Sequence, residues 1–401
     1  MNKEQRYLIE LLSCHINNTK PQKVENINMK ILCDIAKEQL ITGIVYKELL
    51  KSYKKNEIGE TYDEFKRNFF SSVQLFVEQE EALKEISAIL SKNKIQHIFL
   101  KGLQIKKLYP AAELRTMADI DILVRNDDFH NACNSFEELG YDMVSSKPGK
   151  YAVYLKNKII IELHESVSEV HDVEKSCFSS NTAFSLWDMI IPVDEDFNLI
   201  ESCDVNKTYF TNFLIPNALF LLILFHIIKH MRSKAAGIRM FLDLAVVSQK
   251  YYDNLDWEQI CTSITKIGYN KASKYVFYII NKWFSIDIPI CKLEDTTNNL
   301  VTDLEEFILE HGTFGILKKD EYAIRMKHGI LKNIFESREF LKEKYPALEK
   351  YGFLLPLFWI HRFFSFLFGK TRTKFEMKEI IKSIEPAKEY RELLKKIDIE
   401  E

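Results

Sequence analysis

Apolar side chains recur every three or four residues through most of the first 90 positions of this 401-residue chain. The spacing is clear in segments 7–16, 29–50 and 69–90. Residues that lie three or four apart share one face of a helix, so the pattern predicts amphipathic helices. A last helix is expected after Thr373. The same pattern also returns beyond Pro216, in segments 219–230, 238–249, 257–283 and 300–342.

Between residues 95 and 164 the pattern changes to short apolar segments rich in β-branched side chains, which are typical of strands. Two helices are expected among them, a short one at 102–109 and one at 127–140 that Gly140 ends. A tight connection is expected at Asn157, because asparagine tolerates a positive φ. The strands expected are 95–100, 119–124, 141–146, 151–157 and 159–164.

This order of elements predicts an α+β fold, in which a small mixed β-sheet core is flanked by N-terminal and C-terminal helical regions. The boundaries expected are an N-terminal helical region at 1–85, an α/β core at 86–204 and a C-terminal helical domain at 205–401. A chain of this length is long enough for two or three domains.

Composition and charge narrow the class of protein. The formal net charge of −3 argues against a protein that coats nucleic acid through bulk charge, and no stable DNA binding is expected. The seven cysteines are scattered and never spaced as CxxC, which favours a reduced cytoplasm over a disulfide framework or a zinc knuckle. The first residues carry charges where a signal peptide needs an apolar run, so we expect a cytoplasmic protein.

Two apolar segments invite a membrane interpretation, but no transmembrane segment is expected. Segment 219–228 falls short of the roughly 20 apolar residues that span a bilayer. Segment 353–368 is longer, but Pro356, His361 and Arg362 interrupt it, so a buried helix is favoured. Basic residues flank this second segment, which leaves contact with a membrane surface or a partner as the alternative.

The strongest chemical motif is the pair Asp119 and Asp121 in segment 119–124. Alternate side chains of a strand share a face, so the two carboxylates are predicted to lie side by side. Two adjacent carboxylates repel each other unless a cation lies between them. Magnesium prefers such oxygen ligands and also binds the phosphates of a substrate, and manganese is the alternative ion. The bland alternative is a solvated strand edge, since many DxD motifs carry no metal.

A phosphate-binding turn is predicted directly before this strand. Lys101 and Gly102 end the first predicted strand, and a glycine there allows the backbone N–H groups to approach a triphosphate closely. Lys101 and Arg115 add positive charge beside the predicted phosphates. The alternative interpretation is that Lys101 is a solvated strand end and Gly102 an ordinary turn residue.

A third carboxylate is expected from segment 159–164, where Glu162 lies in an otherwise apolar strand. Glu162 and His164 are predicted to share the face opposite Ile161 and Leu163. If this strand pairs with segment 119–124, Glu162 completes a metal site of three carboxylates. The alternative is a salt bridge at the rim of the sheet.

A second cluster lies in segment 226–247. His226 and His230 are four residues apart and therefore share a helical face, but neither an HExxH glutamate nor a third ligand accompanies them. Helix packing or a phosphate-facing pair is favoured over zinc, and their role stays open. Arg239 and Asp243 are also four apart, which indicates a structural ion pair or, alternatively, an arginine that binds a phosphate and is oriented by Asp243.

These motifs resemble a known family. Segments 99–124 (FLKGLQIKKLYPAAELRTMADIDILV), 139–144 (LGYDMV) and 159–164 (IIIELH) are similar to the uncharacterised nucleotidyltransferases of bacteria, within the polymerase-β superfamily. Segments 226–247 and 344–362 are similar to that family's helical part. The chain departs from the wider superfamily where Leu103 follows Gly102, since a serine or glycine is usual there.

The resemblance implies transfer of a nucleoside monophosphate from a nucleoside triphosphate such as ATP. Asp119, Asp121 and Glu162 match the metal-binding and catalytic carboxylates. The expected mechanism is in-line attack by an acceptor hydroxyl on the α-phosphate, with Lys101 and Arg239 neutralising the pyrophosphate. The acceptor is left open among a small molecule, a peptide or protein and tRNA. The rival hypothesis is a catalytically silent protein that binds a nucleotide or a partner on the same fold.

Overall fold

A seven-stranded mixed sheet forms the centre of the computed structural model, in the order β3-β4-β5-β2-β1-β7-β6. The structure describes residues 1–177, 185–200, 204, 207–233, 236–289, 298–311, 354–359 and 392–399. The strands are β1 (His97–Phe99), β2 (Ile120–Val124), β3 (Asp142–Lys147), β4 (Tyr151–Lys156), β5 (Ile159–His164), β6 (Ile190–Pro192) and β7 (Thr211–Leu214).

The middle of the sheet determines which side chains meet. Strand β2 lies between β1, to which it is antiparallel, and β5, to which it is parallel. The register of β2 and β5 places Asp121 opposite Glu162 and Leu123 opposite His164. Strands β4 and β5 form a hairpin whose turn includes Asn157 at φ 56°, as the sequence predicts.

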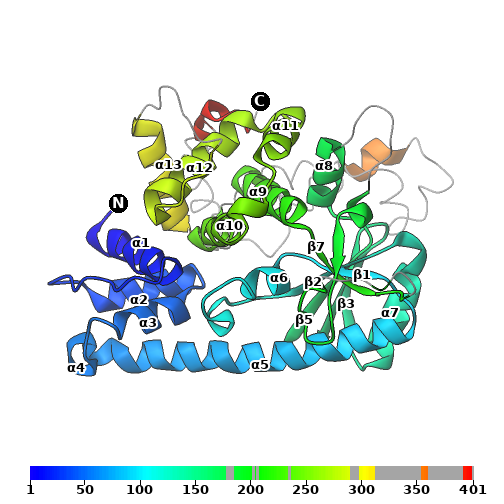
Figure 1. Cartoon of the computed structure of the whole chain (residues 1–401), viewed down its shortest axis with the longest axis horizontal. Coiled ribbons are helices and arrows are strands. Elements are labelled where there is room, and N and C mark those ends of the chain that lie inside the picture. Colours follow the sequence, from blue (N-terminus) through cyan, green and yellow to red (C-terminus); the bar gives the residue numbers. More distant parts are fainter. Residues whose placement is uncertain are drawn as a thin grey trace.

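Helices cover the sheet and extend far to one side of it (Figure 1). The longest, α5 (Tyr62–Lys92), runs along one edge of the molecule and joins the N-terminal helices to the sheet. The remaining α-helices are α1 (Lys3–Ile16), α2 (Met29–Glu38), α3 (Thr42–Leu49), α4 (Lys55–Ile58), α6 (Gly102–Lys106), α7 (Phe129–Glu138), α8 (Ser168–Cys177), α9 (Pro216–Ser233), α10 (Ile238–Lys250), α11 (Trp257–Ile267), α12 (Asn270–Phe284) and α13 (Asn298–His311).

The two faces of the sheet pack into two different hydrophobic cores. Ile120, Ile122 and Val124 of β2 pack with the second half of α5 and with α7. Leu123 faces the opposite way, into a larger core that the N-terminal and C-terminal helices share. Alternation along the strand therefore places Asp121, Glu162 and His164 on the same face as Leu123, which is the face that packs against the larger core.

The α+β class and the flanking helical regions agree with the prediction. Strands β6 and β7 were not predicted, and β7 extends the sheet beyond residue 204. They have three and four residues, too few to show a period of two. The division into three domains stays a prediction, although the helices before and after the sheet share one core.

Several expected elements fall where the structure gives only partial information. Most of segments 300–342 and 353–368, and the start of the helix expected after Thr373, lie outside the described residues. Across the described ranges, every helix is too short or too polar to cross a bilayer.

Candidate active site

The predicted carboxylates gather where β2 and β5 run side by side. Asp119 directly precedes β2, and Asp121 is its second residue. Glu162 of β5 lies opposite Asp121 because the two strands are parallel and in this register. The strand pairing on which the third carboxylate depended is thus present.

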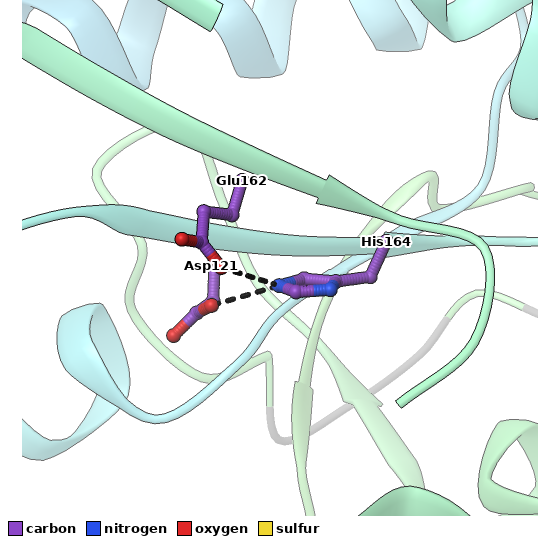
Figure 2. Close-up of side chains that lie close together, drawn as sticks. All are labelled: Asp121, Glu162 and His164. Carbon is purple, nitrogen blue, oxygen red and sulfur yellow. Dashed lines mark hydrogen bonds and ion pairs between the residues drawn. The ribbon is translucent and has the colours of Figure 1, made fainter. Parts of the chain in front are cut away.

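His164 approaches the same two carboxylates more closely than the sequence indicates. Its Nε2 atom lies 2.8 Å from Oδ1 of Asp121 and 3.6 Å from Oε2 of Glu162. Figure 2 shows the ring reaching across from the end of β5, with one nitrogen pointing at both carboxylates. Possible ligand atoms of Asp121, Glu162 and His164 all lie within 4.8 Å of one another, whereas Asp119 is outside this group.

The charges in the site are unevenly balanced. Burial and the charge of Asp121 raise the pKa of Asp119, although Lys101 and Arg239 oppose the rise. Burial, Asp121 and Asp119 likewise raise the pKa of Glu162. Burial also acts on Asp121, but Lys101 and the hydrogen bond from His164 outweigh it and hold its pKa at about 2. The site therefore stabilises the ionised form of Asp121, whereas ionisation of Asp119 and Glu162 is unfavourable.

Lys101 and Gly102 lie at the turn between β1 and α6. The residue with a positive φ in this turn is Lys101, at 49°, and not Gly102. Gly102 is needed for space, because a Cβ atom there would lie 2.4 Å from Sδ of Met117. The Lys101 side chain is only 13% exposed, which argues against a solvated strand end.

Glu169, near the start of α8, was not singled out by the sequence. Its carboxylate is 2% exposed and lies 2.7 Å from Nδ1 of His226, 2.7 Å from Nζ of Lys229 and 3.7 Å from Nζ of Lys101. These contacts keep the pKa of Glu169 well below its usual range in spite of burial. An acidic residue in the first turn of a helix is ordinary in sequence, so nothing in the pattern distinguishes it.

His226 is accounted for by this contact with Glu169. Burial and the charge of Lys101 lower the pKa of His226 to about 4, and its Nδ1 atom lies 2.7 Å from Oε1 of Glu169 and 3.2 Å from Nζ of Lys101. The rings of His226 and His230 are 4.4 Å apart at an angle of 64°. The contact with Glu169 is an interaction within the protein, and the expectation that the pair binds no zinc stays a prediction.

The expected ion pair between Arg239 and Asp243 is replaced by a different one. Nη2 of Arg115 lies 2.8 Å from Oδ2 of Asp243, and the hydroxyl of Tyr109 donates to Oδ1 of the same carboxylate at 2.7 Å. The reason is that Arg115 enters from the loop before β2, so Asp243 is satisfied across elements and not within its own helix. Arg115 also donates to the Gly102 carbonyl at 3.4 Å.

Arg239 is directed toward the loop that carries Asp119. Its Nη1 donates to the Thr116 carbonyl at 3.0 Å, while its buried Nε atom has no hydrogen-bond partner. The Arg239 charge opposes the rise in the pKa of Asp119, so the guanidinium lies near that carboxylate. Together with Lys101, it supplies positive charge beside Asp119.

The donor set suits a divalent cation. Carboxylate oxygens are the usual ligands of hard ions, and a cation placed among them relieves the repulsion that raises the pKa values of Asp119 and Glu162. The neighbouring Lys101 and Arg239 provide the complementary charge that a polyphosphate needs.

Comparison with known proteins supports this chemistry. Residues 25–285 match a family model described as "Uncharacterised nucleotidyltransferase". A search of curated proteins and a search of solved structures found no match. The matched segment contains the sheet, the three carboxylates, Glu169 and Arg239.

The uneven charge balance predicts that the two aspartates affect stability in opposite directions when no divalent metal is present. Asp119→Asn removes a carboxylate with a raised pKa, whose ionisation costs stability, so the free energy of unfolding at pH 7 should rise. This gain should shrink as the pH falls, because wild-type Asp119 then becomes protonated. Asp121→Asn should lower the free energy of unfolding by about 1–2 kcal/mol.

The Asp121 contribution is fully present above the unfolded pKa of 3.8 and is lost as the pH falls toward about 2. Urea denaturation in EDTA at pH 7 and pH 5 measures the change for both variants, and the loss of stability in Asp121→Asn should be the same at the two pH values. Asp142→Asn, at an exposed position on β3, is the matched control and should change little. A shift of the same sign in both aspartate variants would contradict this charge balance.

Proposed function

The chain belongs to the uncharacterised nucleotidyltransferase family, and we propose that it transfers a nucleoside monophosphate from a nucleoside triphosphate to an acceptor hydroxyl. The observation that carries the proposal is the parallel register of β2 and β5, which places Asp121 beside Glu162 on one face of the sheet. A strand gains no stability from such a pair unless a cation neutralises it.

Asp119, Asp121 and Glu162 are the proposed ligands of divalent magnesium or manganese. Nucleotidyltransferases generally use divalent metals, and the oxygen-rich donor set fits them. When bound, such ions activate the attacking oxygen and stabilise the leaving one.

Glu162 is the proposed acceptor of the hydroxyl proton. Its side chain is 35% exposed, so it is accessible to a substrate, whereas that of Asp121 is only 20% exposed.

Lys101 and Arg239 are the proposed ligands of the phosphates and of the leaving pyrophosphate. Glu169 is a positioning residue in this proposal, because its buried carboxylate holds the Lys101 ammonium near β2. The Arg115 guanidinium is bound to Asp243 and to the Gly102 carbonyl, so we propose that it supports the turn and reaches the phosphates through Gly102.

A catalytically silent protein is the second candidate, and one observation favours it. His164 hydrogen-bonds to Asp121, and the charge of Lys101 lowers the pKa of Asp121. The negative charge of this carboxylate is therefore balanced within the protein. The raised pKa values of Asp119 and Glu162 favour the enzyme, because the internal compensation is incomplete for these two carboxylates.

Label transfer distinguishes the two candidates. We expect the protein, with Mg²⁺ or Mn²⁺ and a bacterial cell extract, to transfer label from one of the four α-³²P ribonucleoside triphosphates to an acceptor. The γ-labelled triphosphate should give no transfer above that of the extract without the protein, because the leaving group is pyrophosphate. Loss of the labelled product to ribonuclease or to protease then separates tRNA and protein acceptors from small molecules.

Asp119→Asn, Asp121→Asn and Glu162→Gln should each reduce this transfer by at least about 100-fold, since each removes a metal ligand of the reacting centre. Asp142→Asn, an exposed aspartate on the same sheet, should retain wild-type transfer. Near wild-type transfer by any of the three variants would refute its assignment. Tight triphosphate binding with no transfer to any fraction would favour the silent protein.

Lys101→Met should weaken triphosphate binding about 10- to 100-fold, because a charge-assisted hydrogen bond to a phosphate contributes roughly 1.5–3 kcal/mol. The apolar stem is kept and Glu169 retains His226 and Lys229, so the protein should still fold, with a lower melting temperature in the absence of metal because Asp121 loses the Lys101 charge. Titration with a non-hydrolysable triphosphate measures the effect, with Lys271→Met, a half-exposed lysine of α12, as control. An unchanged dissociation constant for Lys101→Met would exclude the phosphate role.

A further inference from the structure

His164 has a place in the site that the three-carboxylate scheme does not explain. Its side chain is 11% exposed and its Nε2 atom is directed between Asp121 and Glu162, at 2.8 Å and 3.6 Å. The second ring nitrogen lies on the side away from the carboxylates (Figure 2). A histidine that served only as a hydrogen-bond donor to Asp121 has no need to face both acids.

These distances are those of ligand atoms that share one ion. Adjacent ligands of an octahedral ion with bonds of about 2.1 Å lie about 3 Å apart. The 2.8 Å between Nε2 and Asp121 is close to this separation, and the 3.6 Å between Nε2 and Glu162 requires a small inward shift of the glutamate side chain when the ion binds. Imidazole binds metal through the lone pair of an unprotonated ring nitrogen, so the proton would reside on Nδ1.

We propose that His164 is a direct ligand of the divalent ion held by Asp121 and Glu162, and that this nitrogen makes the site select Mn²⁺ over Mg²⁺. The inference rests on the metal site of the proposed function and specifies which ion it takes. Magnesium favours oxygen ligands and dehydrates reluctantly, whereas affinity for nitrogen rises along the first-row transition metals. Replacing an oxygen ligand by an imidazole therefore disfavours Mg²⁺ relative to Mn²⁺.

The alternative is that His164 only orients Asp121 through a hydrogen bond. In that arrangement the nitrogen never touches the ion, and removing it would weaken Mg²⁺ and Mn²⁺ binding by similar factors. A direct ligand predicts a change in the ratio of the two affinities, which a merely structural role would not produce.

Electron paramagnetic resonance of Mn²⁺ on the full-length protein tests the proposal without any turnover. Electron spin-echo modulation from a directly bound ¹⁴N of imidazole is expected in the wild-type complex and should be lost in His164→Gln. The Mn²⁺ dissociation constant should rise at least about tenfold in this variant, as is typical when even an outer partner of a metal site is lost. Competition with Mg²⁺ should show a smaller rise for Mg²⁺.

His171→Gln is the matched control, because His171 is an exposed histidine of α8, and it should keep both the nitrogen signal and the affinity. Bound Mn²⁺ without a nitrogen signal in the wild type, a signal that persists in His164→Gln, or the absence of Mn²⁺ binding would each overturn the proposal. The spectra also separate it from the proposed function. If the protein binds Mn²⁺ through nitrogen but transfers no label, the proposed function is wrong and the His164 ligand stands. If it transfers label but shows no nitrogen signal, the His164 ligand is wrong and the proposed function stands.

Discussion

Repulsion among carboxylates on one face of a sheet is the constraint that organises the rest of the site. The parallel pairing of β2 and β5 forces Asp121 and Glu162 together, and Asp119 lies two residues before Asp121, directly before β2. The protein neutralises this charge only in part, since the pKa of Asp121 is held at about 2 while burial and the neighbouring acids raise that of Glu162. A negative site that is only partly balanced is suited to a divalent cation. Without the cation, other interactions must supply the free energy that stabilises the fold.

That energy comes from the packing around the site. The inner faces of β2 and β5 are buried against α5 and α7, while the helices before and after the sheet share the larger core on the other side. The turn at Gly102 accepts a hydrogen bond from the Arg115 guanidinium, which also binds Asp243 of α10, and Met117 occupies the space that a side chain at position 102 would need. Rigid elements on both sides thus hold Lys101 and the carboxylates at positions that flexible loops would not maintain.

The sequence was informative wherever one strand or one turn determined the outcome. The alternation in segment 119–124 predicted the inward and outward faces of β2. The lone Glu162 in an apolar strand indicated a third carboxylate, on the condition that its strand pairs with β2. Contacts between distant elements could not be predicted from the sequence. Glu169 resembles any acidic residue in the first turn of a helix. Asp243 pairs with Arg115, from the loop before β2, and not with Arg239 of its own helix. Local spacing reports which residues share a face, but it carries no information on which element packs against that face.

The central claim is that one divalent ion and the phosphates of a nucleotide meet at β2 and β5. A crystal structure with Mn²⁺ and a non-hydrolysable triphosphate tests it most directly, because anomalous scattering locates the manganese independently of the density for the nucleotide. The account predicts an anomalous peak within bonding distance of Asp121 and Glu162, with the phosphates on the side of Lys101 and Arg239. A triphosphate bound elsewhere on the protein, or a nucleotide in this position with no metal at the carboxylates, would contradict it.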